Sequence, residues 1–313
     1  MNDATHEPSI TACVTGATGM IGRRIVRKLL KRGCKVRVLT RGAYANPGVE
    51  VFKAGLSDEA ELERFISGAN AVFHCAAEIK DASRMHEVNV LGTERIVSLI
   101  ARHRVEYFCH ISSAGVVGRT SQAWVDESTA CNPQNAYEAT KLGAERIAVR
   151  PIDGCTTVVL RPTNVVDESH LGELRLPVDG TLRSRLEAFV KGGECAQIVH
   201  AEDVAAAAVH FLDRPSGDPR VFFVSLDHDP LNTVANLWRL HRALSRGRSG
   251  IELGPFPHLP AAVPRLLRRL TRGRGNRGTV RYASDRLLSE GFRYSLGVAD
   301  AVQRILQDRA RLR

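Results

Sequence analysis

The sequence is poor in aromatic residues and has no paired cysteines. Aromatic residues make up 5% of the 313-residue chain, so the core of a large α/β domain must be built mainly from aliphatic side chains. The seven cysteines include no Cys-x-x-Cys pair, which fits reduced, structural thiols. The eleven histidines also lack the spacing of metal ligands, so we expect no metal site.

Long apolar runs and a secretion signal are absent as well. No apolar run approaches the roughly 18 residues of a spanning helix, and the polar start MNDATHEP is wrong for a signal peptide. We therefore expect a cytoplasmic protein.

Basic residues, in contrast, are in excess. The net charge is +10, and residues 264–286 contain eight arginines and one acid. This stretch is either an ordinary solvated surface, a clamp for an anionic substrate, or a weak contact with a membrane surface. Nucleic acid is not expected as a partner, because the stretch offers almost no aromatic side chains for stacking on bases.

The first half of the chain alternates predicted strands with predicted helices. Runs of β-branched and apolar residues predict strands at 10–15, 35–40, 49–54, 71–77, 107–113 and 156–162. Helical periodicity predicts helices at 21–32, 58–66, 84–103 and 137–149. This alternation predicts an α/β fold with a parallel sheet covered on both faces.

Three glycines, Gly16, Gly19 and Gly22, follow the first predicted strand and open the first predicted helix. In this context they predict a turn that brings a helix N-terminus to a dinucleotide pyrophosphate. At the end of the second strand, Thr40 and Arg41 stand where NAD-binding sites place an acid. A guanidinium suits a 2′-phosphate, so NADP is favoured over NAD.

Seven motifs occur in one order along about two-thirds of the chain: TGATGMIG (15–22), VFHCAA (72–77), VNVLGT (88–93), HISSAGVVG (110–118), YEATK (137–141), RPTNVV (161–166) and VHAEDVA (199–205). Together they resemble the extended short-chain dehydrogenase/reductase family, also called the NAD-dependent epimerase/dehydratase family. The resemblance implies a Rossmann-type doubly wound parallel sheet with a smaller C-terminal substrate-binding lobe. The Rossmann domain would comprise 1–165 and about 197–225, and the lobe 166–196 and 226–313. A homodimer through helices such as 84–103 and 137–149 is also implied.

The resemblance assigns three catalytic residues, Ser113, Tyr137 and Lys141. Tyr137 would be the general acid/base at the substrate oxygen. The pKa of an unperturbed tyrosine is about 10, so the charge of Lys141 and the nicotinamide would have to stabilise its phenolate. Lys141 would also hold the cofactor ribose, and the Ser113 hydroxyl would align the substrate oxygen.

Binding residues follow from the same resemblance. Those expected at the cofactor are Gly16, Thr18, Gly19, Met20, Ile21, Gly22, Arg41, Leu56, Ala76, Ala77, Asn89, Lys141 and Pro162. Those expected at the substrate are Ser113, Asn164, Arg277 and Arg281. Three departures from the family pattern matter. Gly55 replaces an acid that often holds adenine, and Val117 replaces a tyrosine that many sugar-nucleotide members carry. Ala196 and Gln197 replace a frequent Arg-Asp pair.

Three functions remain open from the sequence. The first is an NAD(P)-dependent epimerase/dehydratase-type enzyme acting at a hydroxyl or carbonyl carbon of a nucleotide-activated sugar, which Asn164 favours and the missing Arg-Asp pair disfavours. The second is a ketone or alcohol oxidoreductase on a non-nucleotide substrate, such as a hydroxysteroid or a flavanone-like molecule. The third is a non-catalytic NAD(P)-binding sensor. A sensor needs no acid/base, so the presence of Tyr137, Lys141 and Ser113 argues against it.

Overall fold

A computed structural model describes residues 10–170, 181–244, 256–260, 262–263, 266 and 278–311. The chain forms two compact units. The first unit comprises Met1–Ser113, Asn135–Leu160 and Ala205–Val221, and the second comprises Ala114–Gln134, Arg161–Val204 and Phe222–Arg313. The proposed division into a cofactor domain and a substrate lobe, with the boundaries given above, stays a prediction.

A seven-stranded sheet confirms the predicted fold class. Its strands are β1 (Thr11–Thr15), β2 (Lys35–Leu39), β3 (Val49–Phe52), β4 (Ala71–His74), β5 (Tyr107–Ile111), β7 (Thr156–Pro162) and β10 (Arg220–Val224). The strand order is β10-β7-β5-β4-β1-β2-β3, and every pairing from β3 to β7 is parallel. The direction of winding reverses between β1 and β4, and ligands of such sheets bind beside that reversal, at the carboxyl ends of the strands.

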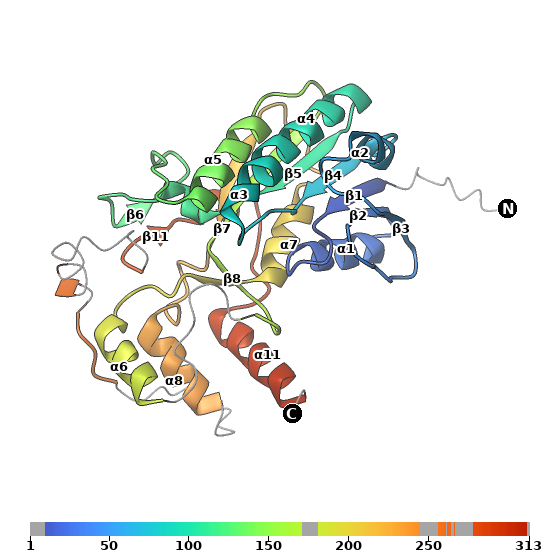
Figure 1. Cartoon of the computed structure of the whole chain (residues 1–313). Helices are drawn as coiled ribbons and strands as arrows, with labels where there is room; N and C mark the ends of the chain where they lie inside the picture. The colour runs from blue at the N-terminus through green and yellow to red at the C-terminus, as the bar shows by residue number, and fades with distance from the viewer. Residues whose placement is uncertain are drawn as a thin grey trace. The chain divides into compact units, whose positions relative to one another are not determined.

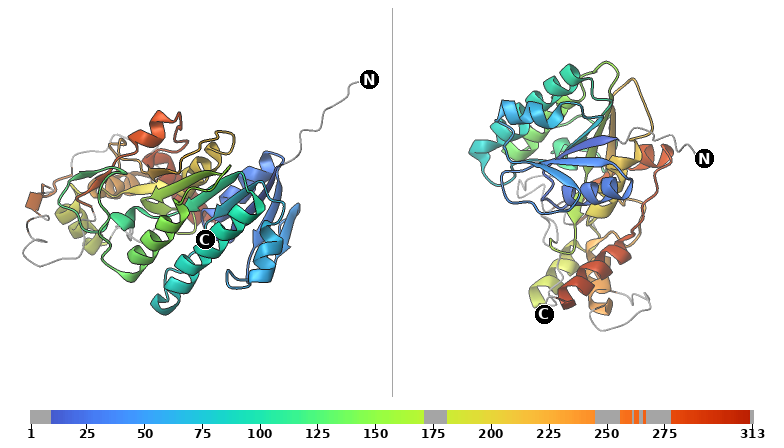
Figure 2. Two further views of the ribbon diagram at one scale, coloured as in Figure 1. Left: turned by 90° about the horizontal axis from the view of Figure 1, so that it is seen from above. Right: turned by 90° about the vertical axis from the view of Figure 1, so that its right-hand side faces the viewer.

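Helices cover both faces of this sheet. One face carries α2 (Glu59–Ile66), α4 (Gly92–His103) and α5 (Ala136–Ala148), and Figure 2 shows α4 and α5 side by side. The core beneath these helices is largely aliphatic, as expected, with a few phenylalanines among the aliphatic side chains. Helix α1 (Gly22–Lys31) lies on the opposite face, with α7 (Ala201–His210) beside it (Figure 1).

The helix predicted at 84–103 is three segments rather than one. It consists of α3 (Ala82–Met85), a π-helical segment from His86 to Leu91, and α4. A π-helical turn has one extra residue per turn, which changes the direction of the side chains that follow. The buried Asn89 lies within this segment. Side-chain periodicity along the sequence does not reveal such an insertion.

The region predicted to return to the sheet near 197–225 contains more than one element. β9 (Ile198–His200) pairs with β8 (Asn164–Val166) in a separate two-stranded sheet, and only β10 joins the large sheet. In the second unit, β6 (Trp124–Val125) also pairs with β11 (Arg281–Tyr282). That unit also contains three helices, α6 (Leu182–Lys191), α8 (Val234–Leu244) and α11 (Val298–Arg311). Both α6 and α11 pack against α8. Within the described ranges, no helix has the length and apolar character required to cross a membrane.

Candidate active site

The glycine turn after β1 depends on two residues that cannot carry a side chain. Gly16 has a φ of 67°, and a Cβ there would lie 2.6 Å from the backbone nitrogen of Ala76. A Cβ on Gly22 would collide with the Gly16 carbonyl oxygen. Helix α1 therefore begins directly over the turn, and the turn lies against the chain that leaves β4.

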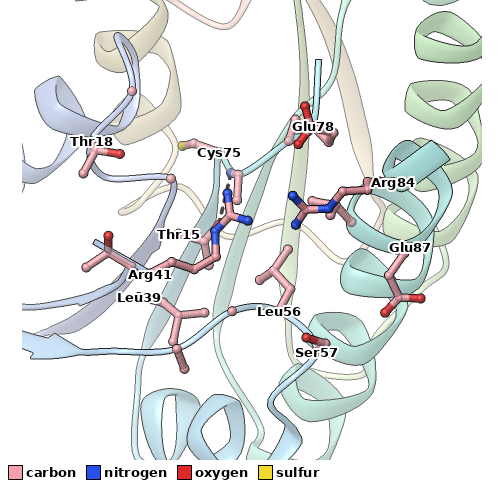
Figure 3. A pocket seen from close by; sticks show the side chains of 18 residues that line it. Thr15, Thr18, Leu39, Arg41, Leu56, Ser57, Cys75, Glu78, Arg84 and Glu87 are labelled. Atoms are coloured by element: carbon pink, nitrogen blue, oxygen red, sulfur yellow. Dashed lines mark hydrogen bonds between the residues drawn. The ribbon is translucent and has the colours of Figure 1, made fainter. Parts of the chain in front are cut away.

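A pocket opens at this reversal point of the sheet, within the first unit. Its lining comes from the segments that follow β1, β2, β3 and β4 and from the start of the interrupted helix: Thr15, Gly16, Thr18, Gly19, Leu39, Thr40, Arg41, Ala54, Gly55, Leu56, Ser57, Cys75, Ala76, Ala77, Glu78, Arg84, Glu87 and Val88. Figure 3 shows the labelled side chains around it. Seven of the predicted cofactor residues are among them: Gly16, Thr18, Gly19, Arg41, Leu56, Ala76 and Ala77.

The other predicted cofactor residues do not line this pocket. Met20, Ile21 and Gly22 belong to the turn and the start of α1. Asn89 and Lys141 are buried. Pro162 is the last residue of β7 and belongs to the second unit. Their roles at a cofactor stay predictions.

Two arginines extend into the pocket, and only one was expected. Arg41 follows β2, and Arg84 comes from α3 (Figure 3). A Cβ on Gly55 would lie 3.7 Å from the Arg41 Cδ, so the missing side chain at Gly55 leaves room for Arg41 to lie across it. Glu78 and Glu87 are the acids of the lining, and neither follows β2, where NAD-binding sites usually carry one.

Tyr137 and Lys141 lie one turn apart on α5, the helix that Asn135 caps at its N-terminus. The Asn135 Oδ1 accepts a hydrogen bond from the Glu138 backbone, which caps the helix directly before Tyr137. Lys141 is 3% exposed, and its Nζ donates a 2.6 Å hydrogen bond to the carbonyl oxygen of Ile111 at the end of β5. Ser113 is two residues further along the chain. The structure thus brings Lys141 to the strand end that leads into Ser113, with Tyr137 one turn earlier on the same helix.

Burial controls the charge of the groups around Lys141. It lowers the pKa of Lys141 to about 8, against the opposing effect of the Glu145 carboxylate. Burial, followed by the positive charge of Lys141, lowers the pKa of His74 to about 3 and that of His110 well below its usual range. Both histidines are therefore neutral near pH 7, whereas Lys141, with a pKa of about 8, still carries most of its positive charge there.

A chain of hydrogen bonds fixes the tautomer of His74. The Thr93 hydroxyl donates to the Asn89 carbonyl at 2.6 Å, so toward the His74 Nε2, 3.1 Å away, it accepts. The His74 Nδ1 then accepts from the Thr15 hydroxyl at 2.7 Å. Thr15 lines the pocket, and its oxygen also accepts from the backbone of Ala76 at 3.3 Å. The network connects the ends of β1 and β4 to α4.

Asn89 connects the pocket to the helix that carries Tyr137. Its Oδ1 accepts from the Glu78 backbone nitrogen at 2.7 Å, and its Nδ2 donates to the Glu78 carbonyl at 3.0 Å and to the Thr140 hydroxyl at 3.1 Å. Thr140 in turn donates to the carbonyl of Tyr137 at 3.0 Å. Asn89 therefore holds the segment after β4 against α5.

The predicted substrate residues other than Ser113 belong to the second unit. Asn164 is the first residue of β8, and Arg281 is exposed on β11. Arg277 lies outside the described residues. Their contact with a substrate stays a prediction.

Comparison with known proteins decides the family. Residues 12–224 match the model of the NAD dependent epimerase/dehydratase family. The chain belongs to this family. The chain is thus an NAD-dependent epimerase/dehydratase-type oxidoreductase of the extended short-chain dehydrogenase/reductase group.

The curated relatives with similar sequences carry names that describe different activities. Sterol demethylase protein B of Methylococcus capsulatus is 29% identical over 91% of this chain and 90% of its own length. A 3 beta-hydroxysteroid dehydrogenase/Delta 5-->4-isomerase of Mycobacterium tuberculosis is 29% identical over 70% of this chain and 65% of its own. Protein y4nG of Sinorhizobium fredii is 31% identical over 64% of this chain, but the match spans only 52% of y4nG.

Solved structures of the family resemble the whole chain. UDP-glucose 4-epimerase of Thermus thermophilus in complex with NAD has a TM-score of 0.70 and 23% identity, over 96% of this chain and 98% of its own. MoeE5 in complex with UDP-glucuronic acid and NAD has a TM-score of 0.69 and 22% identity, over 96% and 99%. At these identities the likeness establishes the fold.

Proposed function

We propose that this epimerase/dehydratase family member oxidises or reduces a hydroxyl or carbonyl carbon, with Tyr137 as the general acid/base. The observation that carries the proposal is the placement of Lys141. Lys141 lies one helical turn after Tyr137 on α5. Its buried ammonium donates a hydrogen bond to Ile111 at the end of β5, and Ile111 is two residues before Ser113 in the chain. A surface lysine four residues after a tyrosine would have neither the burial nor this partner.

In the proposed reaction, the cofactor and the three predicted catalytic residues have separate roles. The nicotinamide supplies or accepts the hydride when it is bound. The Ser113 hydroxyl donates a hydrogen bond to the substrate oxygen and holds it in line for the transfer. The Tyr137 hydroxyl gives a proton to that oxygen during reduction and takes it back during oxidation. The charge of Lys141 stabilises the phenolate that remains, because a nearby cation favours the ionised form.

For the cofactor, two features of the pocket support NADP in preference to NAD: it contains two arginines, and no carboxylate follows β2. Arg41 and Arg84 both extend into the pocket, and Gly55 leaves room for the Arg41 side chain. A planar guanidinium suits the dianionic 2′-phosphate that distinguishes NADP. The solved relatives named above contain NAD, and the NADP preference is proposed from Arg41, Arg84 and Gly55 of this chain alone.

For the substrate, a nucleotide-activated sugar is our first candidate. The likeness to UDP-glucose 4-epimerase and to MoeE5 covers at least 96% of this chain and 98% of theirs, and so extends through the second unit. Asn164 and the exposed Arg281 are the polar groups of the second unit that we propose for the diphosphate.

A second candidate is an apolar ketone or alcohol without a nucleotide. Sterol demethylase protein B matches 91% of the chain. In addition, α6 exposes Leu182, Leu186 and Phe189, by 82%, 61% and 38%, at a spacing that places them on one face. Such a face, together with the arginine-rich stretch 264–286, would suit a membrane surface that carries an apolar substrate.

A thermal-unfolding screen tests the cofactor first and the substrate second. NADP at about 100 times its dissociation constant should raise the free energy of unfolding by about 2.7 kcal/mol. With NADP bound, UDP and related diphosphates should add further stabilisation, which Arg281→Ala and Arg277→Ala should reduce.

The two substrate candidates predict different outcomes in that screen. Stabilisation by no nucleoside diphosphate would remove the nucleotide-sugar candidate. Sedimentation with anionic vesicles, lost in Leu186→Gln but kept in Val51→Thr, would then support the apolar candidate, since Val51 is a comparably exposed residue on β3. Cofactor binding without turnover on either substrate class would indicate a sensor.

A further inference from the structure

A third residue continues the face of α5 that carries Tyr137 and Lys141. Glu145 lies one turn after Lys141 and is 4% exposed. The Ser112 hydroxyl donates a 2.6 Å hydrogen bond to its Oε2. Lys141 bonds to Ile111 and Glu145 bonds to Ser112, so two charged side chains of α5 hold successive residues at the end of β5.

A buried ammonium requires a nearby negative charge, because the protein interior solvates it poorly. The groups that face Lys141 from other elements are His74 on β4, Cys75 after β4 and His110 on β5. Both histidines are neutral, and burial raises the pKa of the Cys75 thiol to about 12, so it is protonated. Tyr137, the other titratable group on this face, has the proton-transfer role in the proposed function and is therefore not counted as a fixed charge. Glu145 is therefore the resting counter-charge of Lys141 among these groups.

We propose that Glu145 is a positioning residue of the active site: its carboxylate keeps Lys141 charged and, through Ser112, holds the strand end that leads into Ser113. The proposal rests on the function proposed above for Tyr137, Lys141 and Ser113. Glu145 touches neither substrate nor cofactor in this account. It acts through Lys141, whose positive charge must persist at the pH at which the enzyme works.

The charge of Glu145 determines the direction in which it shifts the pKa of Lys141. The negative charge of Glu145 raises the pKa of Lys141 and partly offsets the lowering by burial. Glu145→Gln keeps an oxygen that can accept from Ser112 but removes the charge. The pKa of Lys141 should then fall below the value of about 8, and Lys141 should lose its proton near neutral pH.

The experiment is a titration of Lys141 by NMR in protein labelled at the lysine Cε, with the resonance assigned through Lys141→Arg. Glu145→Gln should lower the pKa of Lys141 by about one to three units, the range for a close opposite charge. Ser112→Ala, which removes the hydrogen bond and keeps the carboxylate, should shift it far less. In turnover assays, the alkaline limb of the pH–rate profile should move to lower pH by the same amount in Glu145→Gln only.

The outcomes separate this proposal from the proposed function. An unshifted Lys141 in Glu145→Gln refutes the counter-charge role, whatever the activity. Absence of turnover in the wild-type enzyme counts against the proposed function but leaves the titration readable. If Glu145→Gln does not fold, Lys141→Met/Glu145→Gln should restore folding, because the uncompensated charge is then gone. A double variant that also fails to fold overturns the charge pairing.

Discussion

Arg41 is the residue on which the proposed cofactor preference depends. Arg41→Ala should weaken NADP binding about tenfold to a hundredfold, the equivalent of a charge-assisted contact of about 1.5–3 kcal/mol. NAD binding should change little, because NAD lacks the 2′-phosphate. Calorimetric titration of both cofactors measures this. An equal loss for NAD and NADP would show that Arg41 does not contact the 2′-phosphate.

Gly55 offers a complementary prediction with a matched control. In Gly55→Asp the new side chain would start 3.7 Å from the Arg41 Cδ and carry a charge that attracts the guanidinium. We expect NADP affinity to fall and the ratio of the two affinities to move toward NAD. Gly55→Ala adds the Cβ without the charge and should leave that ratio nearly unchanged. If both variants behave alike, space rather than charge explains the effect of position 55.

Individual site residues could be predicted from the sequence only where they belong to a short motif with fixed spacing. Tyr137, Lys141 and Ser113 were predicted from YEATK and SSAG, and the structure places Lys141 at the strand end before Ser113. Arg84 was missed, since DASRMHE reads as an ordinary helix surface. Glu145 was missed because its meaning lies in the hydrogen bond to Ser112, 33 residues away in sequence.

At the scale of elements, the interrupted helix couples the cofactor pocket to α5 through Asn89. Asn89→Ala would leave the backbone nitrogen and carbonyl of Glu78 without the partners that now satisfy them. A fully buried unsatisfied group costs about 1–3 kcal/mol. Glu78 is half-buried, so the loss per group should lie toward the lower end of that range, and thermal stability should fall. Cofactor affinity should fall with it, because Glu78 and its neighbours line the pocket.

Asn70→Ala is the control for that variant. The Asn70 Oδ1 accepts from the Thr11 backbone at the amino end of β1, at the opposite end of the strand from the pocket. It should lower stability without lowering cofactor affinity. If the two variants lose affinity equally, Asn89 has no specific link to the pocket.

Element boundaries were predictable where local chemistry sets them. Asp58 and Asn135 cap α2 and α5 through their side chains, and both starts were predicted within a residue or two. The π-helical segment was not, because its cause is tertiary: it accompanies a buried Asn89 whose partners are Glu78 and Thr140. The pairing of β8 with β9 was also missed, because strands of three residues are too short to show a clear alternation of apolar and polar residues.

At the scale of the whole molecule, the two buried neutral histidines make stability depend on pH. The pKa of His74 is about 3 in the folded protein and 6.5 without the effect of the fold. The unfolded chain therefore binds this proton first, and stability is lost as pH falls from about 6.5 toward 3. The shift of His110 has the same direction. His74 should contribute a slope of about 1.4 kcal/mol per pH unit in that range, and His110 should add a slope of the same sign.

His110→Phe tests this dependence. Neither ring nitrogen of His110 has a hydrogen-bond partner among the described residues, so replacement by phenylalanine removes the titration without breaking a bond. Denaturant unfolding between pH 6.5 and 4 should show a shallower loss of stability than in the wild type. His86→Phe, at an exposed position, should keep the wild-type slope. An unchanged slope in His110→Phe would mean that His110 titrates normally in the folded state.

The parallel character of the large sheet could be predicted from the alternation of strands and helices, which the sequence shows up to Pro162. Beyond Pro162 the alternation weakens, and the pairing of β6 with β11 joins residues more than 150 positions apart. Contacts of that kind depend on tertiary packing. The second unit is therefore the part of the fold that is least accessible from sequence alone.

The central claim is that Tyr137 transfers the proton that accompanies hydride transfer. The direct measurement is turnover with NADP or NADPH, followed by the absorbance of the reduced nicotinamide, on a panel of nucleotide sugars and hydroxysteroids, for the wild type and Tyr137→Phe. Tyr137→Phe should bind the cofactor normally and turn over at least about a hundredfold more slowly on the accepted substrate. Lys141→Ala should lose both cofactor affinity and turnover. Full turnover in Tyr137→Phe would contradict the account.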